Sequence, residues 1–406
     1  MKRSFRNAAF LTLLALGGAA RADVVYSNLR DTTIPADFTG LFVDVDGNSA
    51  WDLNPFFGGV GVANTSEFQP ARLGTGNLDA INGFAAGDVI DVSRLFSSGY
   101  GGSQTHLGST FTSGQEGYLG FRLNGNFGWM RVVFTANTPG AVIKDWAYET
   151  DGTAIRVGRV RQSAPASGAQ LVTLSPGSGE SFTLGSALTD TGGNVNSLLK
   201  NGGGTTILGG TNTYTGDTTV AAGVLLVNGS LGSSQVGVAG ASLGGTGVIG
   251  GSVTVASGTL SPGASIESLA TGSLSMASGT TFVYEMANTS STGADLLVVS
   301  GSLSLSGVDL VVSGADLGTW LPGDKVTLIG YDGTPIASGF LGYNDDSDYV
   351  FGSNTWRLNY NDTTGGSNYS GEQTGTSFVT LTMVPEPTAP LLVLLGLAAG
   401  WRRRRA

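Results

Sequence analysis

Glycine constrains this chain more than any other feature of its sequence. It occupies 66 of the 406 positions and punctuates short runs of Val, Leu, Ile, Thr and Ser. Because glycine adopts positive φ angles without steric cost, this pattern is typical of many short strands joined by tight turns. Charged residues make up only 12% of the chain, which argues against a helical bundle and against a charge-rich disordered protein. The sequence therefore predicts an all-β protein with roughly two or three domains.

The charge balance and the absence of cysteine exclude several functions. The formal net charge is -10, and the Lys and Arg residues of the body are scattered rather than clustered. Binding to a nucleic acid requires clustered basic side chains that displace counterions, so we do not expect a nucleic-acid partner. Without cysteine the chain has no disulfides, no thiolate metal sites and no cysteine nucleophile.

Residues 1–22 have the pattern of a signal peptide for the Sec export machinery. Basic side chains within residues 2–6 precede an apolar run at 8–16, and Ala20 and Ala22 flank Arg21 in a small-x-small cleavage pattern. We prefer this interpretation to a buried first helix, because polar, strand-like sequence follows at once. The predicted mature chain begins at Asp23.

The other end of the chain, residues 384–406, combines three features in a fixed order. An extended Pro-Glu-Pro is followed by an apolar run at 389–401 and then by an arginine cluster. As a helix the apolar run reaches only about 20 Å, short of the roughly 30 Å hydrocarbon core, although terminal arginines and Trp401 at the interface would relieve the mismatch. Arginines are retained on the cytoplasmic side, which would leave the body outside. The residues concerned are Pro385, Glu386, Pro387, Arg402, Arg403, Arg404 and Arg405.

This C-terminal arrangement closely resembles the PEP-CTERM sorting signal of Gram-negative bacteria. The resemblance implies a short transmembrane helix that anchors the precursor transiently in the inner membrane. It also implies processing by an exosortase near Pro-Glu-Pro and delivery to the cell surface or the medium. Such families are associated with exopolysaccharide and biofilm, which makes an exopolysaccharide a further candidate partner.

The first part of the body, residues 23–162, is rich in aromatic residues. Alternating residues at 117–123 and 129–134 predict two half-buried strands, and Asn124-Gly125 is a strong hairpin dipeptide, although we expect a connection longer than two residues. These features favour an N-terminal antiparallel β-sandwich-like domain. Small, turn-forming residues at 163–177 predict a linker after it. Segments of this part also resemble a block found in the N-terminal halves of many PEP-CTERM proteins, at 117–122, 128–131 and 145–149.

The second part, residues 178–383, is repetitive. Short apolar strands are expected at 205–208, 218–220 and 224–227, separated by Gly, Asn and Asp turns. One such unit cannot bury its own apolar face, so successive units must stack as coils of a solenoid. Later inward-facing rows are expected from apolar positions at 248–249, 253–255, 274, 276, 282–283, 296–299, 303, 305 and 310–312.

Residues 202–229 of this part resemble the autotransporter-associated β-strand repeat, also called the passenger-associated transport repeat. The resemblance rests on Asn-Thr-Tyr-x-Gly-x-Thr-x-Val at 212–220 and on Gly-x-Leu-x-Val-x-Gly at 223–229. The glycine-rich segments at 243–247, 260–263 and 294–301 look like the rungs of autotransporter passengers. The resemblance implies a right-handed parallel β-helix.

Residues that could carry chemistry are few. His106 is the only histidine and lacks a nucleophile motif nearby, so we interpret it as a surface-loop residue. Asp44-Val45-Asp46-Gly47-Asn48 offers oxygen ligands at the spacing of a calcium loop, but Ser49 and Pro55 stand where such a loop requires Gly and Glu. We favour a plain Asx-rich turn there, and treat residues 344–348 in the same way.

Carboxylates for glycoside hydrolysis could come from Asp145, Glu149 or Glu285, but sequence gives neither their separation nor their burial. These candidate carboxylates leave one alternative function open, that of an extracellular polysaccharide lyase or glycoside hydrolase on a β-helix. We prefer a non-enzymatic structural or adhesion protein of the cell surface or extracellular matrix. It is expected to have no catalytic, cofactor-binding or metal-binding residues, and its functional residues are those of export and sorting.

Overall fold

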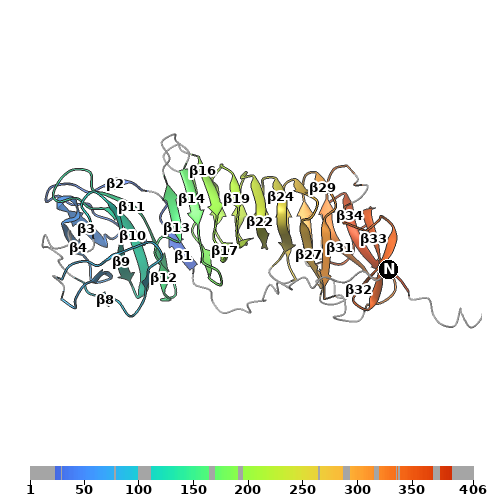
Figure 1. Cartoon of the computed structure of the whole chain (residues 1–406), viewed down its shortest axis with the longest axis horizontal. Coiled ribbons are helices and arrows are strands. Elements are labelled where there is room, and N and C mark those ends of the chain that lie inside the picture. Colours follow the sequence, from blue (N-terminus) through green and yellow to red (C-terminus); the bar gives the residue numbers. More distant parts are fainter. Residues whose placement is uncertain are drawn as a thin grey trace, which may run out of the picture.

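The protein is elongated, and its long axis is set by strands stacked in the middle of the chain (Figure 1). An antiparallel N-terminal part (residues 23–163) lies at one end, and the chain ends in a second antiparallel part at the other. Apart from one 3₁₀ turn, the regular elements of the described residues are all β-strands, in agreement with the all-β prediction. The structure, a computed structural model, describes residues 23–28, 30–76, 79–98, 111–163, 170–190, 195–263, 266–286, 293–314, 320–334, 336, 339–368 and 375–385.

Three long strands form the centre of the N-terminal part: β9 (Glu116–Leu123), β10 (Asn126–Val133) and β11 (Val142–Glu149). They pair in antiparallel order, as the sequence predicts. The prediction of a longer connection between the first two is wrong, because Leu123 pairs directly with Asn126. Asn124 and Gly125 both have positive φ, 50° and 91°, so these two residues complete the hairpin alone.

Both faces of this sheet are buried. Its side chains divide between two hydrophobic clusters, with Trp129 in one and Met130 in the other. Many aromatic residues of this part are buried, among them Phe56, Phe68, Tyr118, Phe121, Phe127, Trp129, Phe134, Trp146 and Tyr148. β2 (Thr32–Thr33) extends the sheet beside β11, and β5 (Phe68–Arg72) and β6 (Gly83–Phe84) extend it beside β9. The other short elements of this part are β3 (Leu53–Phe56), η1 (Phe57–Gly59), β4 (Gly61–Asn64), β7 (Val89–Ile90), β8 (Leu95–Phe96) and β12 (Ile155–Arg156).

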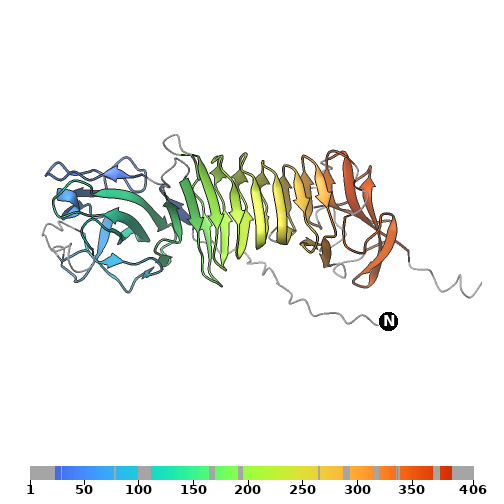
Figure 2. The ribbon, with the colours of Figure 1, turned by 45° about the horizontal axis from the view of Figure 1, so that its top comes forward.

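The middle of the chain, residues 170–331, is here called the parallel stack. Its strands run across the long axis of the molecule and form three ladders of parallel pairs (Figure 2). The first ladder contains β14 (Gln170–Leu174), β16 (Asn196–Lys200), β19 (Thr218–Val220), β22 (Val236–Gly245), β24 (Val253–Pro262), β26 (Leu274–Met276) and β29 (Leu303–Leu305).

The second and third ladders follow the same order along the chain. The second contains β15 (Ser181–Leu184), β17 (Thr205–Leu208), β20 (Val224–Val227), the later halves of β22 and β24, β27 (Thr281–Glu285) and β30 (Asp309–Ser313). The third contains β18 (Thr211–Asn212), β21 (Ser230–Leu231), β23 (Val248–Ile249), β25 (Ser268–Thr271), β28 (Leu296–Val299) and β31 (Lys325–Tyr331).

The ladders keep the same face of every strand inside. In the first ladder each buried residue pairs with the buried residue of the next coil: Leu198, Thr218, Val236, Val253, Leu274 and Leu303. Strand alternation then turns the intervening side chains to solvent. The three strands expected at 205–208, 218–220 and 224–227 are present with those bounds.

A few apolar residues expected in inward rows face outward instead. Val248 and Val311 are 52% and 40% exposed, and Val283 is half-buried. Each lies beside an inward neighbour in its strand, because every second position of a strand points away from the core.

Two strands join the N-terminal part to the stack. β1 (Asp23–Tyr26) pairs with β11 in antiparallel order and with β15 in parallel order, so it lies between the two parts. β13 (Val160–Ser163) pairs with β14, and β14 lies within the segment predicted as a linker at 163–177. One hydrophobic cluster accordingly runs from the N-terminal part through the whole stack.

The far end of the stack is antiparallel. β31 pairs with β34 (Ser377–Met383), which pairs with β33 (Asn354–Asp362), and β32 (Ser347–Phe351) is the outer strand. Phe340 stacks on Phe282 of β27, at a ring distance of 5.9 Å, and covers part of the last coils. The final section of the predicted solenoid segment is therefore an antiparallel cap.

Polar side chains inside the stack bind consecutive coils to one another. The side chain of Asn212 is buried; its Oδ1 accepts from the Leu188 amide at 2.9 Å, and its Nδ2 donates to the carbonyls of Gly210 (2.9 Å) and Ser230 (3.0 Å). Both N–H groups and the oxygen of this buried amide therefore have hydrogen-bond partners. Asn212 thus links three coils through one side chain.

A chain of hydrogen-bonded hydroxyl groups also links consecutive coils nearby. Tyr214 Oη lies 2.6 Å from Thr218 Oγ1, which lies 2.7 Å from Ser234 Oγ, and Ser234 donates to the Gly216 carbonyl at 2.8 Å. Burial raises the pKa of Tyr214 to about 12. The hydroxyls therefore stay neutral and hydrogen-bonded inside the stack.

Lys200 is a fully buried cation in this region. Its Nζ donates to the carbonyls of Gly202 and Ala222, each at 2.8 Å, which belong to consecutive coils. Burial lowers its pKa to about 8. The ammonium group therefore links the turns of two consecutive coils through their carbonyls.

Gly229 of the repeat leaves no room for a side chain. A Cβ there would clash with the carbonyl oxygens of Gly210 and Gly209 in the preceding coil, whereas a Cβ at Gly237 would have no atom within 4 Å. Close approach of backbones, rather than a turn angle, requires glycine at the first position.

We predict that G229A lowers the free energy of unfolding by about 1–3 kcal/mol, the usual cost of overpacking a close contact. The matched variant G237A should change it by less than about 0.5 kcal/mol, as an open surface position allows. Denaturant unfolding of the two variants and of the unsubstituted chain measures both values. Equal destabilisation by the two substitutions would contradict the close stacking at Gly229.

Candidate functional site

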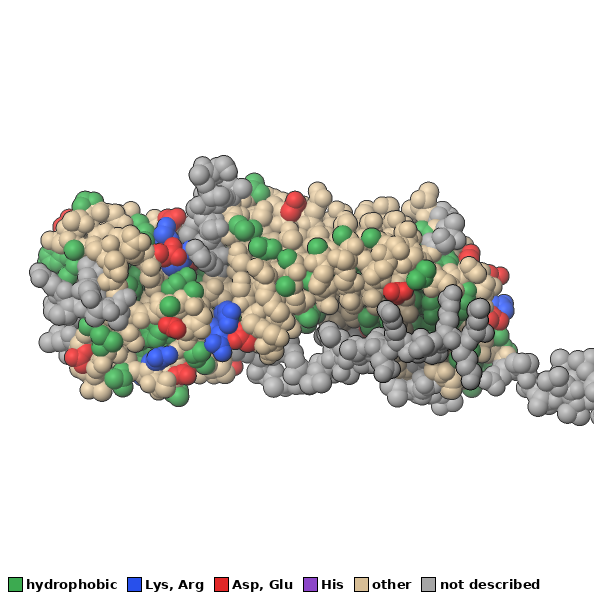
Figure 3. Space-filling view, viewed as in Figure 1, with side chains coloured by type: hydrophobic (Ala, Val, Ile, Leu, Met, Phe, Trp, Pro, Cys, Tyr) green, Lys and Arg blue, Asp and Glu red, His purple; other side chains and the backbone are tan. Residues whose placement is uncertain are grey.

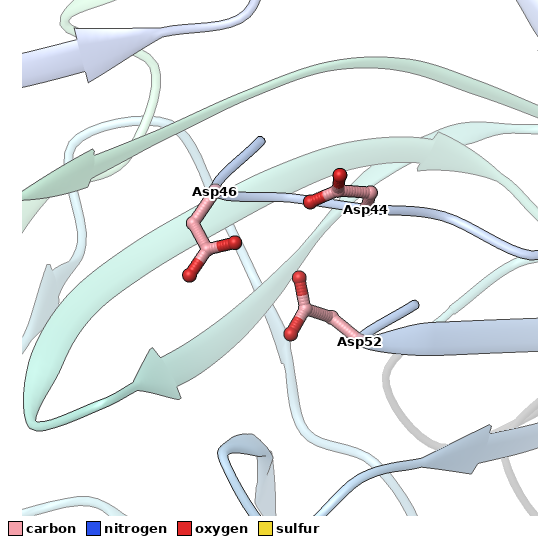
Figure 4. A group of neighbouring side chains, drawn as sticks. All are labelled: Asp44, Asp46 and Asp52. Carbon is pink, nitrogen blue, oxygen red and sulfur yellow. The ribbon is translucent and has the colours of Figure 1, made fainter. Parts of the chain in front are cut away.

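Three aspartate carboxylates converge in the N-terminal part. Carboxylate oxygens of Asp44, Asp46 and Asp52 all lie within 4.8 Å of one another. Figure 4 shows the carboxylates of Asp44 and Asp52 turned toward each other, with Asp46 beside them. The calcium-loop spacing in the sequence contains Asp44 and Asp46 but not Asp52. Val43 forms an antiparallel bridge with Leu53, so the returning chain brings Asp52 alongside; this pairing has no local sequence signal.

Backbone amides of the loop hold the first two carboxylates. Asp44 accepts from the amides of Gly47 (2.7 Å) and Ser49 (2.8 Å), and Asp46 accepts from the Asn48 amide at 3.2 Å. Gly47 and Ser49 both have positive φ, 80° and 72°. The loop therefore has the Asx-turn hydrogen bonds expected from its sequence.

Asp52 is the buried member of the group, with 2% of its surface exposed. Its Oδ2 accepts from the Val45 amide at 2.8 Å. Burial raises the pKa of Asp52, and the negative charges of Asp46 and Asp44 raise it further. The ionised form of this carboxyl is consequently less favourable in the folded chain than in the unfolded chain.

Carboxylate oxygens are suitable ligands for a hard cation such as calcium, which takes six to eight of them. In this loop the same oxygens already accept from backbone amides. The side chain of Asn48, at the fifth loop position, donates to Asp46 at 3.2 Å and accepts from the Ala50 amide at 2.7 Å. The carboxylates are placed as in a calcium loop, but their contacts are those of a turn, and they do not by themselves define a metal site.

The second acidic segment, residues 344–348, forms ion pairs with an arginine. Arg357 lies 2.8 Å from Asp348 and 3.9 Å from Asp346, and Asp345 accepts from the Tyr360 amide at 2.8 Å. The hydrogen bond from Arg357 lowers the pKa of Asp348. These contacts favour a salt-bridged turn over a cation site.

The structure does not bring together the three carboxylates considered for glycoside hydrolysis. Asp145 is fully buried, pairs with Arg131 at 2.6 Å and accepts from Tyr26 Oη at 2.6 Å. Glu149 is on the same strand, whereas Glu285 is on β27, far along the molecule (Figure 1). Asp145 therefore has a structural ion pair, and Glu285 cannot join the other two.

A pocket of about 290 Å³ lies at the joint between the N-terminal part and the stack, with Glu149 in its wall. Arg156, Arg159 and Glu180 also line it, and Glu180 forms ion pairs with both arginines, the second at 3.1 Å. These pairs link β12 to the segment that precedes β15. The charges of the arginines and glutamates compensate one another, so we interpret these side chains as contacts that hold the N-terminal part against the stack.

The export and sorting residues lie mostly outside the described residues. Pro385 is described: it is exposed and follows directly after β34 and Val384, whose amide donates to the Thr355 carbonyl at 2.9 Å. Within the described residues, no helix has both the length and the apolar character needed to cross a membrane. Outside the described residues lie His106, Ala20, Ala22, Glu386, Pro387, Arg402, Arg403, Arg404 and Arg405.

Residues 198–227 match the family model of the Passenger-associated-transport-repeat. The matched segment covers β16 from Leu198 through to β20, and thus contains Lys200, Asn212 and Tyr214, which bind the coils together. The match supports an autotransporter-associated protein that is exported or lies at the cell surface. No curated protein matches the chain.

We predict that D52N raises the free energy of unfolding at pH 7 by up to about 1 kcal/mol, the size typical of partly screened charge interactions. The substitution removes a charge that the fold disfavours, and the amide oxygen can still accept from Val45. Because the folded pKa of Asp52 is raised, its ionisation lowers stability as the pH rises above its usual range. The gain should therefore shrink as the pH falls toward 3.

Thermal scans between pH 3 and pH 7 measure this effect, with D217N, an exposed carboxyl of the stack, as the control. A D52N variant that is less stable at pH 7, or a wild-type midpoint that rises on adding calcium, would contradict the interpretation as a plain turn.

Proposed function

We propose that this chain is an exported, non-enzymatic surface or matrix protein, in which the stack is a right-handed β-helix that serves as a rigid spacer. The observation that carries the proposal is the match to the transport repeat at residues 198–227, which lie in the early coils of three continuous ladders. A spacer must resist bending along its axis. Hydrogen bonds and buried side chains shared by every neighbouring pair of coils provide that resistance.

The surface of the stack supports the spacer role. The face seen in Figure 3 carries few charged side chains along the stack, whereas Lys, Arg, Asp and Glu gather mainly on the N-terminal part and toward the far end. A long uncharged side gives little electrostatic attraction for charged partners. Specific contacts are therefore assigned to the ends of the molecule, and above all to the N-terminal part.

We further propose that residues 1–22 direct export and that the C-terminal segment is a PEP-CTERM sorting signal. An exosortase would act near Pro385, Glu386 and Pro387 while the apolar segment and the arginines hold the precursor in the inner membrane. The exposure of Pro385 directly after the last strand supports this order, because the folded body ends before the processing site. Association with exopolysaccharide or biofilm follows from the same resemblance.

Fractionation of the producing cells tests the proposal. We expect the product at the cell surface or in the medium, beginning at Asp23 and ending near Pro385 by mass spectrometry. A variant with Pro385, Glu386 and Pro387 all replaced by Ala should keep its C-terminus and accumulate in the membrane fraction, while V92A, an exposed control, should be processed normally. Full-length, uncleaved protein in the cytosol would contradict the proposal.

The enzymatic alternative is tested on the producer's own exopolysaccharide. The purified protein is incubated with the polymer, and both retention of the protein and release of reducing or unsaturated ends are measured. We expect retention without new ends. Release of ends that is lost in E149Q would establish the alternative instead.

A further inference from the structure

Three exposed aromatic rings lie in the segment of the N-terminal part that precedes β3. Phe38, Phe42 and Trp51 are 68%, 63% and 41% exposed. Phe38 packs on Phe56 of β3 at a ring distance of 5.2 Å, and Phe42 meets the edge of Trp51 at 5.6 Å. These rings are held in place by one another, although water covers much of their surface.

Phe42 also forms one wall of a pocket of about 180 Å³. Trp146, which is buried, also lines the pocket, and Arg30, Thr32 and Asp44 supply polar groups. The Arg30 guanidinium lies over the Trp146 ring, 5.3 Å from its centre. The pocket thus combines an exposed aromatic face, a positioned cation, a hydroxyl and a carboxylate.

This combination suits a ring that carries many hydroxyls. A guanidinium only donates hydrogen bonds, a carboxylate only accepts them, and a sugar hydroxyl does both. The negative face of an aromatic ring attracts the polarised C–H groups of a pyranose. Selective pockets generally pair apolar walls with a few positioned polar groups in this way.

The charges near the pocket restrict the ligand further. Asp44 in the pocket wall belongs to the cluster with Asp46 and Asp52, whose carboxylate oxygens all lie within 4.8 Å of one another, whereas Arg30 is the one cation among the described lining residues. An anionic sugar or an anionic membrane surface would meet net negative charge here. A neutral ligand meets no such repulsion.

We propose that this pocket binds a neutral pyranose unit of a polysaccharide, stacked on Phe42 and hydrogen-bonded by Arg30 and Asp44. The inference rests on the proposed function, since it assigns the contact that an exported spacer would present. Trp51 extends the aromatic surface beside the pocket for a neighbouring unit of the polymer.

Affinity electrophoresis of the full purified chain tests the inference, with neutral dextran, mannan and galactan, and anionic alginate, as probes. We expect at least one neutral polymer to retard the chain and alginate to leave it unaffected. F42A and R30M should each weaken retention by about tenfold, the effect usual for a central contact residue. V92A, an exposed apolar control outside the pocket, should match the unsubstituted chain.

Thermal midpoints of all variants show whether each is folded. If R30M is unfolded, D44N replaces it as the variant that removes a polar contact of the pocket. Failure of every neutral polymer to bind, stronger retention by alginate, or retention unaffected by F42A would overturn the inference. Because electrophoresis uses purified protein, it tests the pocket alone. Cytosolic, uncleaved protein in the cell fractions would refute the proposed function while leaving the pocket's affinity measurable.

Discussion

Each coil of the stack depends on its neighbours for both its backbone hydrogen bonds and its hydrophobic contacts. Among the described residues, every ladder pair joins one coil to the next. Paired residues also keep the same face inward from coil to coil, so a shift by one residue would turn the buried row to solvent. The buried hydrogen bonds of Asn212, Lys200 and Tyr214 also join neighbouring coils, and they further stabilise the register in which the strands pair.

A structure of this kind must cover its two ends, because exposed strand edges pair with other chains. At the first coil β1 supplies a parallel partner to β15, and β13 supplies an antiparallel partner to β14. At the last coil β31 changes from parallel to antiparallel pairing through β34. The N-terminal part is therefore both a cap for the stack and the part that presents the proposed sugar pocket.

Much of the stack could be predicted because its signals are local. Gly, Asn and Asp mark the turns, and the strands at 205–208, 218–220 and 224–227 have the predicted bounds. Signals of long-range pairing are absent from the sequence. Strand β14 lies in a segment whose small, turn-forming residues predict a linker. It forms a strand because it pairs with β13 and β16, which are distant signals that its own residues do not carry. Asp52 and Arg30 have no signal in the sequence for the same reason: the Val43–Leu53 bridge brings Asp52 to Asp44, and a backbone hydrogen bond to Lys144 holds Arg30 beside β11.

Engineered cysteine pairs test the stacking most directly, because the chain has no cysteine of its own. Thr254 pairs with Ser275, and Ser275 with Ser304, and all three are exposed. Strands lie about 4.8 Å apart, within the range of a disulfide, whereas two coils are separated by about 10 Å. We expect T254C/S275C to form an intramolecular disulfide under mild oxidation and T254C/S304C to stay reduced. A disulfide in the second variant, or none in the first, would contradict the in-register stack.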